Sequence, residues 1–323
     1  MSTQETYLKG IADAIREKTG ETGTIKAAEF ADKIAYISAG VEKPSWKLAT
    51  GLTDGSWQWL TYGAGIFLAL QATRIARSVD GKNWTQYAAP FSSGYGRIRY
   101  CKDRFFLLVQ NSATGYYSYD GLSWSAFSLP TSKQWTDITY GSNKFVATCQ
   151  NSYDIAYSTD GESWTLLTSK SANSWLYSIC YGRDRFVAVG SSTTFMYSTD
   201  GVSWNSGTLP VGGSWNKVAY LKDRFIAINF NLEKIVYSYD GITWQSIDAD
   251  KSLEGICYGA NKFVYSGYRH VAYSVDGITW TPCTVIPSLK FYEIAYGMGV
   301  FVVVNIDNGG IYYLEDFFSE WAE

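Results

Sequence analysis

The chain has 323 residues, 17% of them aromatic, and a formal net charge of −3. This weak negative charge argues against a nucleic-acid partner, because such partners are held mainly by neutralising their phosphates. No run of about 20 apolar residues occurs, and no charged-then-apolar leader is present. We therefore expect neither a membrane span nor a secretion signal. The five cysteines lack the spacing of a metal site, so we expect buried thiols, made in a reducing cytoplasm, and no metal or cofactor.

Residues 1–43 show the apolar spacing of short helices. Leu8, Ile11 and Ile15 recur at helical spacing, and a second apolar series follows over residues 30–37. Two short amphipathic helices bury little apolar surface on their own, so the segment needs a partner. We therefore predict a helical N-terminal adaptor over residues 1–43, separate from the remainder of the chain.

This adaptor also resembles a short element of tail and tail-fibre proteins from phages and prophages of Firmicutes. The matching sequences are IADAIREKTG at residues 11–20 and TIKAAEFADKI at residues 24–34. Those relatives usually have a proline after the Ile-Lys pair, where this chain has Ala27. In them the element joins a virion-attaching part to a host-facing part. The resemblance implies that residues 1–43 bind other tail or virion proteins, and that the protein is found in the virion or outside the cell after lysis.

From residue 44 onward the sequence repeats. The pattern Asp-Gly-x-x-Trp occurs six times, at intervals of 40, 40, 40, 40 and 36 residues, and a Tyr five residues before a Phe occurs seven times. A period near 40 residues is typical of repeat folds. Each repeat contains four short apolar segments separated by Gly, Asn, Asp or Ser, which is typical of four strands. The six Asp-Gly copies begin at Asp80, Asp120, Asp160, Asp200, Asp240 and Asp276.

Seven repeats of four strands predict an all-β fold, a seven-bladed β-propeller of four-stranded blades over residues 44–323. The repeats are split between the two ends: residues 46–51 end a repeat that has no body before it, and Asp316 stands where a seventh Asp-Gly would fall. Ring closure explains this split better than a solenoid or an eighth blade does. We expect residues 46–51 to form the outer strand of the last blade, covering its open edge.

The repeat Ser-x-Asp-Gly-x-x-Trp, as at residues 158–164, resembles the Asp-box of sialidase-like propellers, which carries one more residue between Asp and Gly. In that family the Asp-box is a structural turn remote from the active site, so the resemblance implies a fold and no activity. The family's Arg-Ile-Pro motif has no match in the chain, which has a single histidine, His270. We find no catalytic constellation and predict that the protein is not an enzyme.

Strand alternation places the repeat turns on one face of the ring and the variable loops on the other, where binding usually occurs. Aromatic residues precede the inner strands at this second face. They either pack between blades or stack on sugar rings, with nearby amides binding the sugar hydroxyl groups. The candidate glycan-binding residues are Trp57, Tyr95, Trp135, Trp175, Trp215, Phe291, Asn111, Asn151, Asn231, Arg269 and His270.

These observations favour a non-catalytic binding module of a phage or prophage tail that recognises a bacterial surface polysaccharide. Several copies per particle, or a homo-oligomer, would supply avidity. One alternative is a glycan-cleaving enzyme with a site in the central channel, where Asp137, Glu254 and Glu293 are the candidate acids. The other is a structural tail component, which would show a large apolar surface instead of a polar-lined pocket.

Overall fold

The computed structural model describes the propeller nearly completely and very little of the first 45 residues. The compact unit spans Trp46–Asp316. The predicted helical adaptor lies outside the described residues except at Ala12, Asp13 and Arg16, so it gains no support from them. The described residues are 12, 13, 16, 46–53, 55–92, 96–150, 154–167, 175–229, 231–249, 251–283, 289–307 and 310–315.

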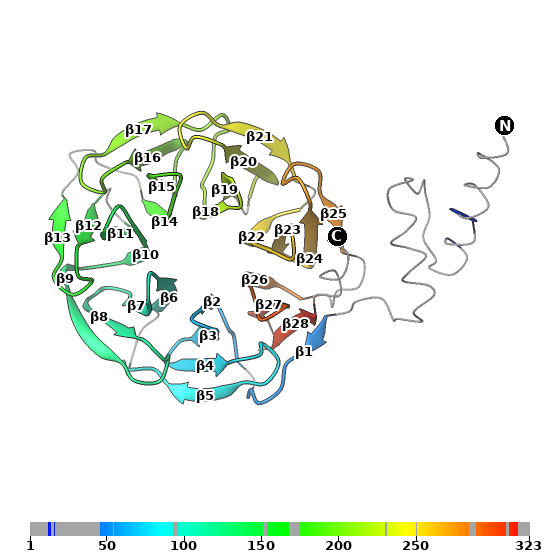
Figure 1. Cartoon of the computed structure of the whole chain (residues 1–323), viewed down its shortest axis with the longest axis horizontal. Coiled ribbons are helices and arrows are strands. Elements are labelled where there is room, and N and C mark those ends of the chain that lie inside the picture. Colours follow the sequence, from blue (N-terminus) through cyan, green and yellow to red (C-terminus); the bar gives the residue numbers. More distant parts are fainter. Residues whose placement is uncertain are drawn as a thin grey trace. The chain divides into compact units, whose positions relative to one another are not determined.

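Seven antiparallel four-stranded sheets form a ring, with the first strand of each sheet at the centre (Figure 1). The all-β, seven-bladed propeller predicted from the repeats is therefore confirmed. From the inner to the outer strand the blades are: blade 1, β2 (Trp59–Gly63), β3 (Ile66–Gln71), β4 (Arg74–Ser78) and β5 (Thr85–Ala88); blade 2, β6 (Gly96–Cys101), β7 (Arg104–Val109), β8 (Ser112–Ser118) and β9 (Ser125–Lys133); blade 3, β10 (Trp135–Gly141), β11 (Lys144–Cys149), β12 (Ile155–Ser158) and β13 (Thr165–Leu167); blade 4, β14 (Leu176–Gly182), β15 (Arg185–Gly190), β16 (Thr194–Ser198) and β17 (Asn205–Thr208); blade 5, β18 (Lys217–Leu221), β19 (Arg224–Ile228), β20 (Lys234–Ser238) and β21 (Gln245–Asp248); blade 6, β22 (Leu253–Gly259), β23 (Lys262–Gly267), β24 (His270–Ser274) and β25 (Thr281–Pro282); blade 7, β26 (Phe291–Gly297), β27 (Val300–Asn305), β28 (Ile311–Glu315) and β1 (Lys47–Leu48).

The second strand of each blade forms the core between neighbouring blades. In β7 and β27 every residue is buried, as expected for strands covered on both faces. The repeat Tyr and Phe face each other across the first hairpin, with ring centroids 4.6 Å apart for Tyr62 and Phe67. Repeated apolar and aromatic residues therefore serve the packing of blade against blade.

The Asp-Gly turns are closed by side-chain hydrogen bonds. In blade 3 the Asp160 carboxylate accepts bonds from the backbone N–H groups of Glu162 and Ser163, both at 2.8 Å. These bonds lower the pKa of Asp160 to about 2. Gly161 follows with φ +81°, a conformation that glycine adopts without strain. Because each carboxylate is used by its own turn, the repeated aspartates are structural.

The last blade is closed by the first described strand, as predicted. Strand β1 pairs antiparallel with β28, with Lys47 opposite Tyr313 and Leu48 opposite Tyr312. The strand is shorter than the predicted 46–51, because Thr50 leaves the sheet to bridge Asn83 in blade 1. The Lys47 ammonium lies 3.1 Å from the Glu315 carboxylate at the end of β28. Both described ends of the propeller are thus held in blade 7.

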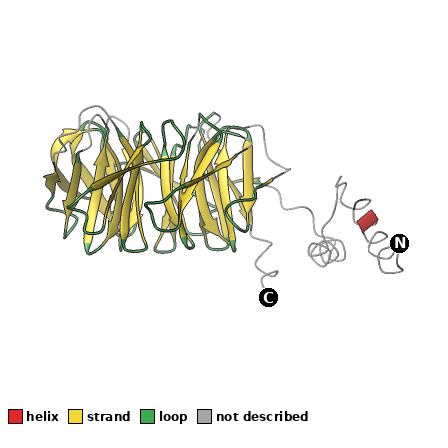
Figure 2. Ribbon diagram, turned by 90° about the horizontal axis from the view of Figure 1, so that it is seen from above, coloured by secondary structure: helices red, strands yellow, loops and turns green. Residues whose placement is uncertain are grey.

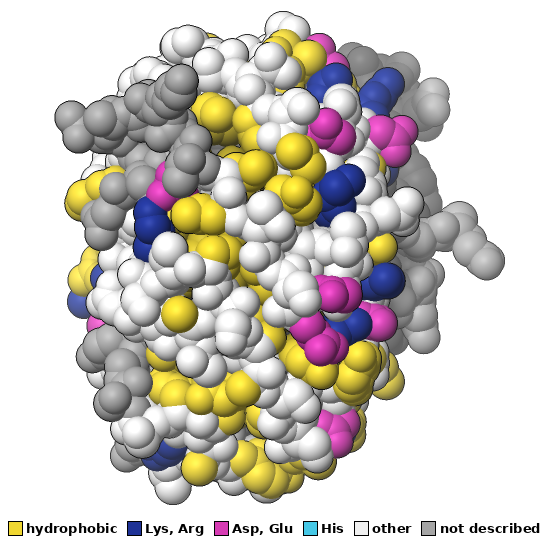
Figure 3. Space-filling model, turned by 90° about the vertical axis from the view of Figure 1, so that its left-hand side faces the viewer, with side chains coloured by type: hydrophobic (Ala, Val, Ile, Leu, Met, Phe, Trp, Pro, Cys, Tyr) yellow, Lys and Arg dark blue, Asp and Glu magenta, His cyan; other side chains and the backbone are white. Residues whose placement is uncertain are grey.

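Alternating strands give the disc two distinct faces (Figure 2). We call the face that carries the Asp-Gly turns and the turns between the first two strands the turn face. The opposite face, with the segments that enter the inner strands and the loops between the second and third strands, is the entry face. On the side of the ring in Figure 3, basic and acidic side chains lie beside each other without a basic stripe.

Candidate functional site

The predicted circle of aromatic residues is largely buried. Trp57, Trp135, Trp215 and Phe291 expose none of their surface, so none of these rings can stack on a sugar in this structure. Among the other predicted aromatics, Trp175 is 41% exposed, and Tyr95 lies outside the described residues. The stacking interpretation therefore needs correction for these four rings.

Packing between blades explains the burial. Trp215 contacts a cluster that includes Phe195 and Leu209 of blade 4 and Val218 and Phe225 of blade 5. It therefore fills the wedge between two sheets. Trp135 does the same between blades 2 and 3, and its indole N–H donates to the Thr131 carbonyl at 3.1 Å. The sequence left open whether these aromatic residues pack between blades or stack on sugar rings. Trp135 and Trp215 pack between blades.

The remaining predicted residues do not form one site. His270, predicted as a glycan-binding residue, is 7% exposed and lies in β24, where its Nε2 is 3.0 Å from the Tyr265 hydroxyl. It is therefore an internal residue of blade 6. Asn111 and Arg269 are exposed on separate blades, and Asn151 lies outside the described residues. Asn231 alone of this predicted polar set borders a central cavity.

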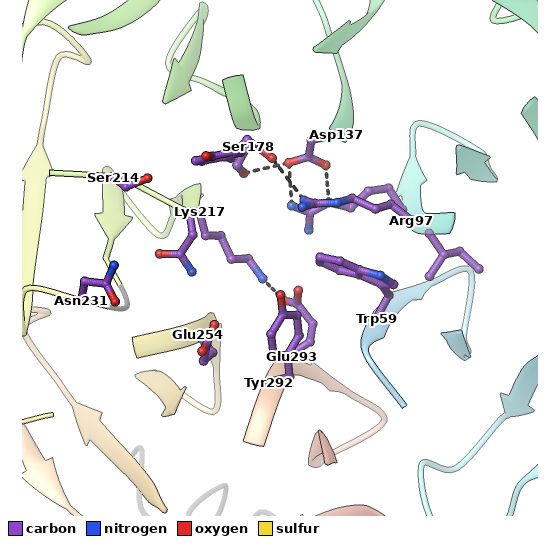
Figure 4. Close-up of a pocket in the computed structure, with 14 residues that line it drawn as sticks. Trp59, Arg97, Asp137, Ser178, Ser214, Lys217, Asn231, Glu254, Tyr292 and Glu293 are labelled. Carbon is purple, nitrogen blue, oxygen red and sulfur yellow. Dashed lines mark hydrogen bonds and ion pairs between the residues drawn. The ribbon is translucent and has the colours of Figure 1, made fainter. Parts of the chain in front are cut away.

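This cavity of about 240 Å³ lies at the entry-face mouth of the central channel (Figure 4). Its walls come mainly from the first residues of the inner strands, joined by residues of the entry-face segments of blade 5. It is lined by Trp59, Arg97, Ile98, Arg99, Asp137, Tyr177, Ser178, Ser214, Asn216, Lys217, Asn231, Glu254, Tyr292 and Glu293.

Irregularities in strand pairing aim several of these side chains at the cavity. The register shifts between Leu176 and Ser178 in β14 and between Leu253 and Gly255 in β22. A bulge adds one residue to a strand and redirects its side chains. The added residues are Tyr177 and Glu254, and both line the cavity. Tyr292 reaches the cavity from the corresponding irregular stretch of β26.

Asp137 joins three blades at one wall. It is 1% exposed and binds the Arg99 guanidinium of blade 2 through both oxygens, at 2.7 and 2.9 Å. From blade 4, its Oδ2 accepts bonds from the Ser178 hydroxyl at 2.8 Å and the Ile179 N–H at 3.1 Å. Burial alone would raise the pKa of Asp137, but the Arg99 charge and hydrogen bonds lower it below its usual value. Asp137 is thus an ionised structural carboxylate.

A second ion pair joins the Lys217 ammonium of blade 5 to the Glu293 carboxylate of blade 7 across the cavity (Figure 4). Both side chains are buried, at 8% and 7% exposure. Burial lowers the pKa of Lys217, and the Arg99 charge adds to this effect, whereas the carboxylate partner favours the charged ammonium. Truncating either partner would leave an uncompensated buried charge.

Glu254 differs from the other two acids. No ion pair holds it among the described residues, and burial raises its pKa to about 7, against the opposing charge of Lys290. A carboxyl with this pKa can exchange a proton near neutral pH. Glu254 is therefore the one acid of the described cavity wall outside an ion pair.

Another part of the cavity wall is aromatic and cationic. The Arg97 guanidinium carbon is 4.1 Å from the centroid of the Trp59 ring, a cation–π contact. Trp59 in turn meets Tyr292 edge to face, with ring centroids 5.4 Å apart. All three side chains keep some exposed surface. They present apolar ring surface and a charge to the cavity.

The sequence identified Asp137, Glu254 and Glu293 as inner-strand acids but missed Trp59, Arg97, Lys217 and Tyr292. A pattern in the repeats could have revealed these residues. The residue three positions before the repeat Tyr is different in every blade, whereas the residue two positions before that Tyr is always Leu, Ile or Val. Because this variable position faces the channel, it marks the cavity wall. The variable residues are Trp59, Arg97, Asp137, Ser178, Lys217, Gly255 and Glu293.

The described residues contain no cluster of three or more His, Cys, Asp or Glu side chains suited to hold a metal ion. They also contain no helix with the length and apolar character needed to cross a membrane.

Comparison with known proteins identifies the fold. No family model and no curated protein matches the sequence. A streptogramin B lyase structure is similar with a TM-score of 0.74 at 12% identity, covering 84% of this chain and 98% of that chain. An inactive virginiamycin B lyase from Staphylococcus aureus with quinupristin gives 0.74 at 13%, covering 84% and 99%. YCF48 bound to a D1 peptide gives 0.66 at 15%, covering 85% and 96%. At these identities the likeness shows a β-propeller and assigns no activity.

Proposed function

We propose that this protein is a non-catalytic binding module of a phage or prophage tail, and that it recognises a bacterial surface glycan in the channel-mouth cavity. The cavity carries the proposal, because it combines the aromatic rings of Trp59 and Tyr292 with the amides of Asn216 and Asn231. Sugars are commonly bound by ring stacking together with polar side chains that bind their hydroxyl groups. The resemblance of residues 1–43 to tail-protein adaptors supplies the biological context.

The direction of the strands supports this arrangement. Trp46 precedes β1, and Lys47 contacts Glu315 at the end of β28, so the chain enters the propeller on the turn face. The cavity opens on the entry face, bordered by Asn231 from the loop between β19 and β20. The first residues of the propeller therefore lie on the face opposite to the proposed binding site.

The size of the cavity limits what it can hold. At about 240 Å³ it is smaller than the roughly 300 to 1,000 Å³ of pockets for drug-sized ligands. It suits one sugar unit or the end of a glycan better than a long segment. Affinity at a single site of this kind is modest, and multiple copies on one particle raise the overall affinity.

Attachment to cells tests the proposal. The purified chain, labelled with a fluorophore, is mixed with cells of candidate Firmicutes hosts before and after removal of wall polysaccharide. We expect binding that is lost with the polysaccharide and weakened several-fold by Tyr292→Ala combined with Asn231→Ala. Lys144→Ala and Lys222→Ala alter the turn face and serve as controls. Binding that survives polysaccharide removal, or equal losses in both sets of variants, would contradict the proposal.

A glycan-cleaving enzyme is the second candidate, and Glu254 favours it. A general acid works best with a pKa near 7, which burial gives to Glu254, and Asp137 and Glu293 line the same cavity. Both of these partners, however, are already engaged by Arg99 and Lys217. Release of reducing ends from wall polysaccharide, abolished by Glu254→Gln, would establish the enzyme; polysaccharide that stays intact would exclude it for that substrate.

A structural role in the virion is a third candidate function, and side chains on the turn face favour it. Exposed apolar side chains project from the repeat turns of several blades, which suits contact with another protein more than contact with a sugar. Capture of tail proteins by the chain, without attachment to cells, would favour this role. These residues are Val79, Tyr119, Leu122, Tyr239, Ile242, Val275, Ile278 and Met298.

A further inference from the structure

We infer that the glycan carries an anionic group, a carboxylate or a phosphate, and that Arg97 binds it at the mouth of the channel. This inference rests on the proposed function and specifies the class of ligand. It follows from the pairing of the charged side chains in the cavity and from the Asn216 Oδ1 atom, a hydrogen-bond acceptor without a partner among the described residues.

The cations of the cavity are not equivalent. Arg99 is held by Asp137 through two hydrogen bonds, and Lys217 is paired with Glu293. Arg97 has no carboxylate within ion-pair distance among the described residues, although it lines the same cavity. Asp137 acts on Arg97 only from beyond ion-pair distance, and its oxygens are bonded to Arg99. A partly buried guanidinium without a directly bonded carboxylate is a favourable place for an anion, because a desolvated charge gains most from a paired partner.

The geometry of Arg97 prepares it for this role. Its Nη1 donates to the Tyr177 carbonyl at 3.2 Å, and its guanidinium carbon lies 4.1 Å from the centroid of the Trp59 ring. These contacts fix the side chain while using one of its five N–H donors. A guanidinium held in this way can offer paired donors to the two oxygens of a carboxylate or a phosphate.

The rest of the wall suits a sugar that bears the anion. The Asn216 Oδ1 atom is buried and accepts no hydrogen bond from the described residues, so it can accept one from a sugar hydroxyl group. Glu254 is the one acid of the described wall outside an ion pair, and its pKa of about 7 leaves it partly protonated at neutral pH. Its repulsion of an incoming anion is correspondingly reduced.

Calorimetric titration of the purified full-length chain with three sugars tests the inference. Glucuronate supplies a carboxylate, glucose 6-phosphate supplies a phosphate, and glucose supplies the ring without charge. We expect at least one acidic sugar to bind about tenfold or more tightly than glucose, as a charge-assisted hydrogen-bond pair provides. Arg97→Gln should remove this preference and leave the melting temperature unchanged. Arg183→Gln removes the same charge from the turn face and should change nothing.

The outcomes separate the inference from the proposed function. Equal affinity for the three sugars, no measurable binding of any of them, or an Arg97→Gln variant that keeps the preference overturns the inference. If cells are still bound through the cavity in that case, the proposed function stands with a neutral glycan. If the chain fails to bind cells that retain their wall polysaccharide, the proposed function is wrong, whatever the titrations with the three sugars show.

Discussion

At the scale of single residues, the acids of the cavity show how the environment separates chemically identical groups. Asp137 is buried more deeply than Glu254, yet its pKa is lowered while that of Glu254 is raised to about 7. The difference comes from Arg99 and Ser178, which supply the charge and hydrogen bonds that Glu254 lacks. Burial alone therefore does not determine whether a carboxyl in this channel is charged.

Glu254 makes the stability of the fold depend on pH. Its pKa is about 7 in the folded chain against 4.5 as the ordinary value, so the folded state holds the proton more tightly than the unfolded state. The associated stabilisation is complete below about pH 4.5 and is lost as the pH rises through 7. We expect Glu254→Gln, which does not titrate, to gain roughly 1 to 3 kcal/mol relative to the wild type between pH 5 and pH 8. Urea unfolding of both proteins at pH 5 and pH 8 measures this change in the free energy of unfolding.

A difference between variant and wild type that stays constant across this pH range would show that Glu254 is as hydrated in the folded chain as in the unfolded one. The neighbouring charges in the cavity, Arg97, Arg99, Asp137, Lys217 and Glu293, are the same in both proteins, and Tyr292 and Lys290 are also unchanged. Their own titration therefore cancels in the comparison.

Sequence reasoning at this scale was successful for turns and weak for the site. Asp160 and Gly161 could be assigned to a turn because their chemistry is local. Whether Trp215 faces the solvent or a neighbouring blade depends on contacts with residues far away in the sequence, which spacing does not show. The bulges that turn Tyr177 and Glu254 into the cavity interrupt the two-residue alternation that predicts which way a side chain points.

At the scale of elements, the entry-face tryptophans hold blades together. Trp215 fills the space between blades 4 and 5, and its indole N–H has no acceptor among the described residues, so its contribution is one of packing. We expect Trp215→Ala to lower the free energy of unfolding by about 3 to 5 kcal/mol, because truncating a buried aromatic side chain leaves a cavity. Trp175→Ala, at a site that is 41% exposed, is the control and should cost much less. Chemical denaturation gives both values.

Cell attachment by the Trp215→Ala variant, measured where it is still folded, should match that of the wild type. Loss of attachment with unchanged stability would mean that this ring reaches the ligand after all.

Closure of blade 7 can be tested by deletion. Removing residues 1–52 takes away β1, the buried Trp46 and the contact of Lys47 with Glu315, and leaves β28 as an open edge. We expect this deletion to cost at least about 3 kcal/mol, the value of one emptied tryptophan site, and to promote aggregation. Removal of residues 1–40 retains β1 and should leave the melting temperature of the propeller unchanged. Equal melting temperatures for the two deletions would refute closure by β1.

At the scale of the whole molecule, the propeller has two faces, and the proposed binding site lies on the entry face alone. This can be tested with single cysteines introduced at Asn231 on the entry face or Arg183 on the turn face. The partly exposed Cys283 is replaced by Ser in both variants. After biotin labelling, we expect streptavidin to block cell attachment from position 231 and to have no effect from position 183. Blocking from position 183 alone would place the binding site on the turn face.

The seven-bladed architecture was predictable because the same local sequence pattern recurs in each of the seven repeats. Each copy specifies four strands and their turns, and the split of one repeat between the two ends specifies the ring. The cavity was less predictable because it is built from the positions at which the copies differ, such as Arg97, Lys217 and Glu293. Repetition carries information about the scaffold, and the departures from repetition carry information about the site.

The closing strand also sets the order of events during synthesis. Lys47 and its partner Glu315 are 268 residues apart, so β1 leaves the ribosome long before the strand that it must pair with has been made. Contacts this distant in sequence form late and slow the completion of a fold. All strands of the first six blades are synthesised before β28, the strand that β1 pairs with. Until then residues 46–50 must be kept from pairing elsewhere, and nascent chains side by side on one message could exchange this strand, since each offers the same unfilled edge.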